Sequence, residues 1–319
     1  MRYAVVFKTY TWDGFVHRQA SRCKAAAGRG DFFISVDETN GSVGPIAFDR
    51  VVRVTNDKIV ASGFANRFEK GSLLWWNPDY VHYQFQEAYP DYDFYVFIEY
   101  DAVVQGQIET LIDQVAESGT DLVAFPIQMA KQDWFWTPFH RQTYELEDLQ
   151  GALICMTVFS RRALEMLAAR RRAMTKDGQV RYWPNAEVFV PTEITRAKFK
   201  SRSLAEFGDV DAYQWFPPIL EDDLQEIAGM AFLHPVLDRR RYVSALLKTT
   251  TQFRSFLYPR SKMWLALRRF PKKDYMPGLA GAARKRFFTS MGEKAHRSKL
   301  RMAARVAFSR SSKELSAQP

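Results

Sequence analysis

Two acidic residues separated by one position, Glu99 and Asp101, directly follow the apolar segment 94–98. At the carboxyl end of a buried strand, both carboxylates can turn toward one bound ion. Mg²⁺ and Mn²⁺ prefer such oxygen ligands and keep further coordination positions for phosphate oxygens and water. The spacing therefore predicts a Mg²⁺ or Mn²⁺ site that binds a diphosphate. The alternative is a pair of solvated loop acids without a ligand.

The segments around this pair alternate between strand-like and helix-like patterns. Short apolar runs predict strands at 3–7, 32–36, 50–54, 94–98, 121–125 and 152–159. Helical spacing and capping signals predict helices at 13–27, 57–64, 80–89 and 108–118, and after Ser160. This alternation predicts an α/β fold with a mostly parallel sheet flanked by helices. Ligands of such sheets lie beyond the carboxyl ends of the strands, where Glu99 and Asp101 fall.

The composition excludes several classes of protein. The 319 residues include two cysteines, Cys23 and Cys155, too few for a disulfide framework, a Cys-rich zinc site or an iron–sulfur site, so a reduced cytoplasmic setting is expected. No apolar run approaches the roughly 20 residues of a membrane span, and the N-terminus turns polar after Phe7, too early for a signal peptide. Walker A and GxGxxG motifs do not occur, which argues against ATPases and dehydrogenases.

The order of elements, with Glu99-Tyr100-Asp101 closing the strand at 94–98, resembles the GT-A class of nucleotide-sugar glycosyltransferases, whose DxD motif lies at this place. The resemblance covers residues 1–240, and the first acid here is Glu99 where the family pattern has Asp. It implies a GT-A-like (Rossmann-like) domain, a nucleotide-sugar donor, and a divalent metal held by Asp101 and Glu99. Contact of Glu99 with the donor ribose is the alternative.

The same resemblance implies two further site residues. Metal-dependent members often add a late histidine ligand, a role that His234 fits; a histidine that caps a strand before Pro235 is the alternative. In inverting members a carboxylate deprotonates the acceptor hydroxyl. Glu187 fits this role because its aromatic and apolar neighbours would raise its proton affinity. An edge-strand surface acid is the alternative, the acidic triplet 221–223 is a rival, and in a retaining enzyme the leaving phosphate can serve as base.

Nucleotide recognition in this architecture falls to the ends of the first two strands. Lys8, Thr9 and Tyr10 follow the first strand and Asp37 follows the second, and polar turn residues without a ligand are the alternative. Aromatic clusters suit an acceptor cleft because sugars stack on aromatic rings, although an aromatic core explains them equally. These clusters contain Trp75, Trp76, Trp134, Phe135, Trp136, Trp183, Trp215 and Phe216.

Charge is divided unevenly along the chain. Residues 238–319 carry 21 Lys and Arg against 4 Asp and Glu, whereas residues 1–237 carry 24 against 32. An apolar stripe lies within the basic part, at Leu300, Ala303, Ala304 and Ala307. Basic residues beside aromatic ones predict a helical tail that lies on an anionic membrane surface; a solvated, partly disordered tail is the alternative. Nucleic acid is disfavoured as a partner, because the acidic body repels a polyanion and no nucleic-acid-binding motif occurs.

The sequence thus predicts a transferase domain at 1–240 and a basic, amphipathic tail at 241–319. We expect a metal-dependent enzyme that moves a sugar from a nucleotide-sugar donor to a hydroxyl of a cell-surface glycan or lipid-linked acceptor, with Glu187 and Asp101 in catalysis. Its expected location is the cytoplasm, peripheral on the inner face of the cytoplasmic membrane, in polysaccharide biosynthesis. A non-catalytic membrane-associated or polyanion-binding scaffold and a nucleotidyltransferase are the alternatives.

Overall fold

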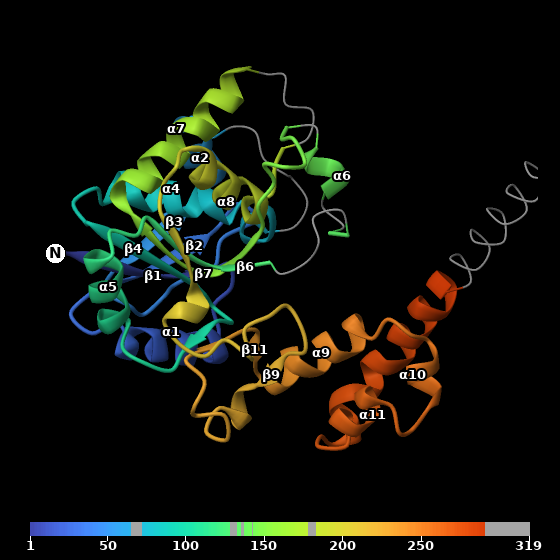
Figure 1. Ribbon diagram of the computed structural model, residues 1–319. Helices are drawn as coiled ribbons and strands as arrows, with labels where there is room; N and C mark the ends of the chain where they lie inside the picture. The colour runs from blue at the N-terminus through green and yellow to red at the C-terminus, as the bar shows by residue number, and fades with distance from the viewer. Residues whose placement is uncertain (65–71, 128–132, 135–136, 142, 178–182, 291–319) are drawn as a thin grey trace, which may run out of the picture. The chain divides into compact units, whose positions relative to one another are not determined.

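The computed structural model describes residues 1–64, 72–127, 133–134, 137–141, 143–177 and 183–290. Contacts between Cα atoms divide the chain into two units, Met1–Val236 and Leu237–Pro319. The first unit contains the large sheet and every residue that the sequence nominates for metal binding or catalysis (Figure 1). The apolar stripe at 300–307 lies outside the described residues.

Seven strands form the large sheet, in the order β3-β2-β1-β4-β7-β6-β8. Their bounds are β1 Tyr3–Thr9, β2 Asp31–Asp37, β3 Val51–Val54, β4 Phe94–Glu99, β6 Leu122–Pro126, β7 Ala152–Ser160 and β8 Ser201–Ser203. Strand β7 runs antiparallel to β4 and β6, and the other pairings are parallel. The predicted fold class, α/β with a mostly parallel sheet, is confirmed.

Helices cover both faces of this sheet (Figure 1). On one face lie α4 (Pro78–Ala88), α7 (Arg161–Asp177) and α8 (Ala186–Arg196), and on the other α1 (Gly14–Ala26) and α5 (Ile108–Glu117). Shorter helices in this unit are α2 (Asn56–Ala61), α3 (Leu73–Trp76) and α6 (Thr137–His140), with 3₁₀ turns at Leu204–Glu206 and Glu221–Asp223. The sheet therefore has an apolar core on each side.

Strand β1 is buried on both faces because its side chains alternate between these two cores. Ala4 and Val6 pack with apolar residues of α4, α7 and α8, whereas Val5 and Phe7 pack with apolar residues of α1 and α5. Such two-sided burial produces the continuous apolar runs from which the strands were predicted. The polar residues that follow each run are thereby placed at one edge of the sheet.

Helix α1 begins and ends close to the predicted positions. The carboxylate of Asp13 accepts hydrogen bonds of 3.1 Å from the backbone N–H groups of Phe15 and Val16, which caps the N-terminus. Gly28, just beyond the C-terminus, has a φ of +61°, a conformation that glycine adopts without steric cost. Local capping chemistry therefore sets both ends of this helix.

Strand β7 is the main departure from a parallel sheet. The chain between β6 and β7 contains, in its described part, only the short helix α6, and no long helix of this part crosses over the sheet. Antiparallel neighbours need no crossover helix, whereas parallel neighbours do. The apolar pattern at 152–159 predicts a strand but not whether it runs parallel or antiparallel to its neighbours, because the same residues are buried in either case.

A second, two-stranded sheet joins distant parts of the first unit. Strand β5 (Val103–Val104) pairs antiparallel with β10 (Phe232–Leu233), and the backbone N–H of Val236 donates a 2.7 Å hydrogen bond to the carbonyl of Asp101. Two further short strands are β9 (Ile219–Leu220) and β11 (Val236–Leu237). The small sheet places residue 234 beside the segment that follows β4.

The second unit is helical in its described part. It contains α9 (Arg239–Thr249), α10 (Arg254–Leu257) and α11 (Lys262–Leu267), and residues 272–290 are helical as well. Its buried apolar side chains include Tyr242, Leu246, Met263, Leu267 and Phe270. In the described part of the chain, no helix combines the length and the apolar character that a membrane crossing requires.

A buried ion pair holds the helices on one face of the sheet together. Arg171 of α7 and Asp79 of α4 both have fully buried side chains, and the guanidinium Nε donates to Asp79 Oδ2 at 2.7 Å. The guanidinium also lies 3.7 Å from the ring centre of Phe189 in α8 and donates to the carbonyl of Pro184 at 3.0 Å. One side chain thus connects α4, α7 and the segment that enters α8.

We expect Asp79→Ala to lower the free energy of unfolding by about 3–5 kcal/mol, because it leaves the guanidinium of Arg171 buried without its counter-ion. Arg29→Ala is the control, since Arg29 pairs with Glu109 and Asp113 at the surface and its loss should cost under about 1 kcal/mol. Urea unfolding of both variants measures the difference. Equal losses for the two variants would contradict the central position of the buried pair.

Candidate functional site

A cavity of about 600 Å³ opens where β4 ends. Its lining comprises Tyr10, Ser72, Leu74, Trp75, Pro78, Glu99, Tyr100, Asp101, Cys155, Asn185, Glu187, Trp215 and His234. The three groups predicted as metal ligands and the acid predicted as base therefore line one cavity. They come from three separate segments of the chain, since Glu99 and Asp101 share one.

The two acids that follow β4 differ in their surroundings. Glu99 is supported from within the protein by Lys8, whose fully buried ammonium lies 3.3 Å from Glu99 Oε1 and 3.1 Å from His82 Nε2. Lys8 and Glu99 are register partners on β1 and β4, so the sheet itself sets this contact. Asp101 Oδ1 is buried and has no hydrogen-bond partner in the described part of the chain. Burial and the nearby charge of Glu99 raise the pKa of Asp101.

His234 faces Asp101 across the cavity. The small sheet and the Val236–Asp101 hydrogen bond bring its ring to within 3.8 Å of the carboxylate, measured from Nε2 to Oδ1. The other ring nitrogen, Nδ1, lies 2.9 Å from the carbonyl of Gln214 and must donate to it. In the neutral ring this bond leaves the lone pair on Nε2, at the cavity side, as in histidine ligands of metals.

The donor set fits a divalent cation. Glu99 and Asp101 supply hard carboxylate oxygens and His234 supplies an imidazole nitrogen, the ligand types that Mn²⁺ and Mg²⁺ sites use. The unpaired, buried Oδ1 of Asp101 is the atom that a cation would satisfy. Of the described residues lining the cavity, none is Lys or Arg, so no side chain there takes the place of a metal.

Glu187 lies in the first turn of α8, and not on an edge strand. Asn185 caps this helix, accepting from the backbone N–H of Glu187 at 2.6 Å, and its own N–H donates to His140 Nε2 at 3.0 Å. Burial raises the pKa of Glu187 to about 8, the charge of Glu99 adds to the shift, and a hydrogen bond from Trp215 opposes it. The side chain therefore combines an elevated proton affinity with access to the cavity.

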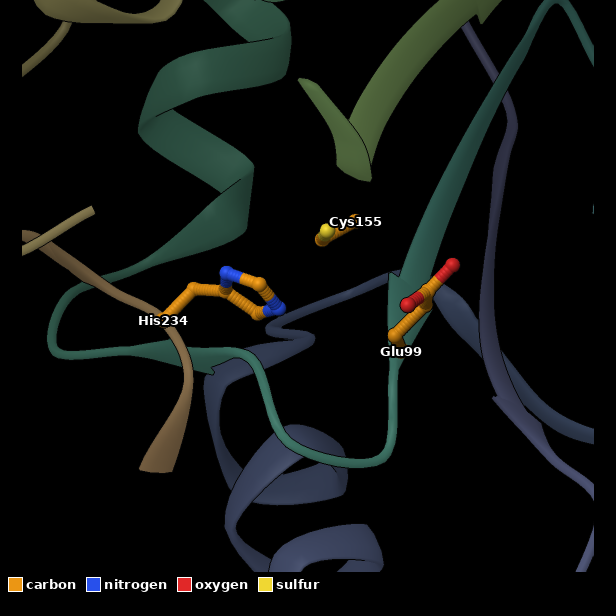
Figure 2. Close-up of side chains that lie close together, drawn as sticks. All are labelled: Glu99, Cys155 and His234. Atoms are coloured by element: carbon orange, nitrogen blue, oxygen red, sulfur yellow. The ribbon is translucent and has the colours of Figure 1, made fainter. Parts of the chain in front are cut away.

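Cys155 enters the same cavity from β7. A carboxylate oxygen of Glu99, the Sγ of Cys155 and a ring nitrogen of His234 all lie within 4.8 Å of one another (Figure 2). Burial raises the pKa of the thiol well above its usual range, and the charges of Glu99, Asp101 and Glu187 add to this shift. The sulfur is thus surrounded by the acidic groups of the site.

The residues expected to bind nucleotide occupy different positions. Tyr10 is exposed, lines the cavity, and its hydroxyl lies 3.3 Å from that of Tyr100. Lys8 and Thr9 are fully buried and do not line this cavity. Lys8 instead supports Glu99, and Thr9 donates to the carbonyl of Thr11.

Tyr10 and Asp37 also line an adjoining pocket of about 300 Å³ at the ends of β1 and β2. The carboxylate of Asp37 accepts from the backbone N–H and the hydroxyl of Thr39 and, through its other oxygen, from the N–H of Leu73. Asp37 thus ties the loop after β2 to α3. Asp37 lines the pocket, and both of its carboxylate oxygens accept hydrogen bonds from other residues of the protein.

The aromatic clusters separate into cavity and core. Trp75 and Trp215 are exposed and line the cavity, and Trp75 belongs to the short helix α3. Trp76 and Trp134 are buried in the protein, and the indole N–H of Trp183 donates to the hydroxyl of Tyr80. Phe135 and Trp136 lie outside the described residues.

The rival acid lies elsewhere. Glu221 forms ion pairs of 2.6 Å with Arg18 and with Arg22, and these two arginines lower the pKa of its carboxyl group. Glu221 does not line the cavity at the end of β4. Two other histidines, His82 and His140, are buried. His82 stacks on Phe97 and accepts from Lys8, so it belongs to the support beneath Glu99.

Sequence reasoning missed Cys155 and Asn185 as site residues. Cys155 lies within an uninterrupted apolar strand, and the number of cysteines in the sequence excludes only sites that need several of them. Asn185 lies two residues before Glu187, and an Asn directly before a helix is a capping signal that could have identified it. No local signal marks Cys155, because its role depends on the pairing of β7 with β4.

No protein-family model matches this sequence, and no curated protein matches it. Solved structures with similar chain traces include mouse xyloside xylosyltransferase 1 in its apo form, at 10% identity and a TM-score of 0.41, covering 73% of this chain and 97% of that one. The galactosyltransferase LgtC in complex with donor and acceptor sugar analogues matches at 11% identity and 0.41, covering 88% and 95%.

A CMP:2-keto-3-deoxy-manno-octonic acid synthetase complexed with CTP is also similar, at 10% identity and a TM-score of 0.36, covering 64% of this chain and 89% of that one. The similar chain traces thus include both sugar transferases and a synthetase that binds a nucleoside triphosphate. Their shared architecture does not distinguish the reactions. The chemistry of this chain rests on its own cavity.

We expect Glu187→Gln to stabilise the protein at alkaline pH. The pKa of Glu187 is raised from 4.5 to about 8, so its stabilising contribution is complete below pH 4.5 and is lost as pH rises through about 8. A neutral glutamine avoids this loss, and the Tm advantage of the variant should therefore grow between these two pH values. Thermal unfolding across that range measures it.

Glu206→Gln is the control of opposite sign. Arg202 lowers the pKa of Glu206, which gives a contribution that is present above pH 4.5 and lost as pH falls. The Glu206 variant should therefore be less stable than the parent protein at neutral pH. A Tm difference for Glu187→Gln that does not change with pH would contradict burial of its charge.

Proposed function

We propose that this protein is a metal-dependent glycosyltransferase that moves a sugar from a nucleotide-sugar donor to a hydroxyl group of a glycan or lipid-linked acceptor. The observation that carries the proposal is the meeting of Glu99, Asp101, His234 and Glu187 in one cavity at the carboxyl end of β4. Carboxylates and an imidazole there suit a cation, and the cation suits a diphosphate. The solved structures of sugar transferases with similar chain traces agree with this proposal.

The cation site would hold the diphosphate of the donor. Asp101 and Glu99, with His234, would hold Mn²⁺ or Mg²⁺, which neutralises charge on a departing diphosphate when bound. Lys8 keeps Glu99 in place from beneath, since the two residues face each other on neighbouring strands. The adjoining pocket beside Tyr10 and Asp37 is where the nucleoside would lie, with Tyr10 shared by both pockets.

Glu187 would act on the acceptor. Its carboxylate takes the proton of the acceptor hydroxyl while that oxygen forms a bond to the anomeric carbon and the bond from this carbon to the diphosphate breaks. A base with a pKa near 8 has a strong affinity for that proton. Trp75 and Trp215, exposed on the cavity wall, offer faces on which a sugar ring can stack. This role holds for inversion of configuration; a retaining reaction can use the leaving phosphate as base.

Two other functions make different use of the same acids. A nucleotidyltransferase would also bind a metal and a phosphate chain, and it would release diphosphate while joining a nucleotide to its substrate. A non-catalytic scaffold would bind neither donor nor metal. Analysis of the products formed from a panel of nucleotide sugars separates sugar transfer from nucleotide transfer.

The second unit supports a membrane-associated version of this function, with a lipid-linked acceptor. Exposed apolar side chains are frequent there, and they include Leu257, Tyr258, Leu265, Met276, Phe287 and Phe288. Arg284, Lys285 and Arg286 directly precede the last two of these. Apolar and basic side chains in this combination bind anionic lipid surfaces. The tail would then hold the enzyme at the inner face of the cytoplasmic membrane.

We expect Asp101→Asn to reduce sugar transfer and donor hydrolysis about 100-fold or more, because the amide cannot supply the anionic ligand that the cation requires. Calorimetry with UDP and GDP should show binding that depends on Mn²⁺ in the parent protein and is lost in the variant. Asp113→Asn is the control, since Asp113 lies at the surface beside Arg29. Full activity of Asp101→Asn with an unchanged Tm would remove this acid from the mechanism.

We expect the protein to bind vesicles containing phosphatidylserine more strongly than vesicles of phosphatidylcholine alone, and less strongly as salt is added. Replacing Arg284, Lys285 and Arg286 by Gln should weaken binding about 100-fold, at roughly 1 kcal/mol for each basic residue. Lys198→Gln, on the first unit, should change binding little. Equal binding to both vesicle types would refute electrostatic docking; vesicle sedimentation measures all three proteins.

A further inference from the structure

We propose that the cation site is a mixed site in which Cys155 adds a thiolate ligand to Glu99 and His234, so that it binds thiophilic divalent cations such as Zn²⁺ and Cd²⁺. The inference concerns the cavity of the proposed function and deepens it by assigning the sulfur a role. A carboxylate and imidazole site alone would serve Mn²⁺ or Mg²⁺. The sulfur makes Zn²⁺ a competitor for the same place.

The geometry brings three different donor atoms together. Glu99 comes from the end of β4, Cys155 from the middle of β7, and His234 from the segment after β10 (Figure 2). Their ligand atoms lie within 4.8 Å of one another, about 1 Å more than tetrahedral zinc ligation spans at bond lengths of about 2.0–2.3 Å. Side-chain rotation about the existing backbone can supply that change, since Glu99 has rotatable bonds and its carboxylate is partly exposed.

The imidazole is oriented for ligation by a bond on its far side. His234 donates from Nδ1 to the carbonyl of Gln214, and this bond fixes the tautomer in which Nε2 carries a lone pair. The side chain is 8% exposed, so this orientation is held by packing. A carbonyl that accepts from the second nitrogen is the usual partner of a metal-bound histidine.

The charges of the cavity also favour a cation beside the sulfur. The negative charges of Glu99, Asp101 and Glu187 lie near the thiol of Cys155 and raise its pKa beyond the effect of burial. The ammonium of Lys8, beneath the cavity, lowers it. Among the described residues of the lining, three are acidic and none is Lys or Arg. A divalent ion offsets this excess of negative charge, and a fourth donor, Asp101 Oδ1, lies 3.8 Å from His234 Nε2.

Ligand softness decides which ion profits from the sulfur. Thiolates bind Zn²⁺ and Cd²⁺ far better than Mg²⁺ or Mn²⁺, and Mn²⁺ stands below Zn²⁺ in the general order of affinities. In the binding step a metal–sulfur bond forms, the S–H bond breaks, and the proton passes to the buffer. No oxidant or reductant takes part. The step therefore releases one proton more when sulfur is a ligand than when it is not.

The two cysteines of the chain give the experiment a matched control. Both are buried, but Cys23 lies in α1, where burial alone raises the pKa of its thiol. We would titrate Cd²⁺ into the full-length parent protein, Cys155→Ser and Cys23→Ser, and record the ultraviolet cadmium–thiolate charge-transfer band. The band should appear in the parent and in Cys23→Ser and be absent in Cys155→Ser.

Competition with Mn²⁺ measures the preference. Zn²⁺ affinity should fall about 10-fold or more in Cys155→Ser, because even the loss of a residue that hydrogen-bonds to a metal ligand lowers metal affinity by this factor. Mn²⁺ affinity should change little. If Cys155→Ser does not fold, a second experiment uses Cys23→Ser, in which Cys155 is the remaining thiol. Bound Zn²⁺ should then protect Cys155 from an alkylating reagent. No band in the parent protein, an equal band in both variants, or no protection by Zn²⁺ would overturn the inference.

The outcomes separate this inference from the proposed function. Binding of UDP or GDP that depends on Mn²⁺, without a thiolate band, would leave the transferase proposal intact and refute the sulfur ligand. A thiolate band that only Cys155→Ser removes, without nucleotide binding under any metal, would support the sulfur ligand and refute the transferase proposal.

Discussion

Desolvation of carboxylates is the constraint around which this molecule is organised. Glu99, Asp101 and Glu187 share one cavity, and the described lining contains no Lys or Arg to balance them. Burial raises the pKa values of Asp101 and Glu187, which means that the folded protein holds these groups at an energetic cost. Groups of this kind persist where a ligand, a reaction or both use them. The balance is provided in part by Lys8, which lies beneath Glu99.

The fold delivers these acids through contacts that are distant in sequence. Parallel pairing of β1 with β4 sets Lys8 opposite Glu99, and the small sheet of β5 and β10 brings His234 to Asp101. The N-cap of α8 fixes Glu187. Strand pairing sets the first two contacts, whereas the third depends on the side chain of Asn185, so the position of the cavity follows mainly from strand order and register.

Much of this could be predicted from local patterns. The apolar run at 94–98 followed by Glu99 and Asp101 predicted a strand with acids at its carboxyl end, and Asp13 predicted the start of α1, because capping and burial act over a few residues. The position of Cys155 could not be predicted, since it depends on the pairing of β7 with β4. Lys8 was expected beside a nucleotide, but a polar residue inside an apolar strand gives no sign of which face it will occupy.

The guanidinium of Arg171 has a consequence for engineering. Replacing a buried ion pair by apolar residues of similar volume often makes a protein more robust, and the pair with Asp79 invites such a design. Here the same guanidinium donates to the carbonyl of Pro184, one residue before the cap that positions Glu187. An apolar redesign would therefore release the entrance of α8 while it strengthened the core. Heat resistance and alignment of the carboxylate are opposed at this position, and directed evolution for one should be accompanied by selection for the other.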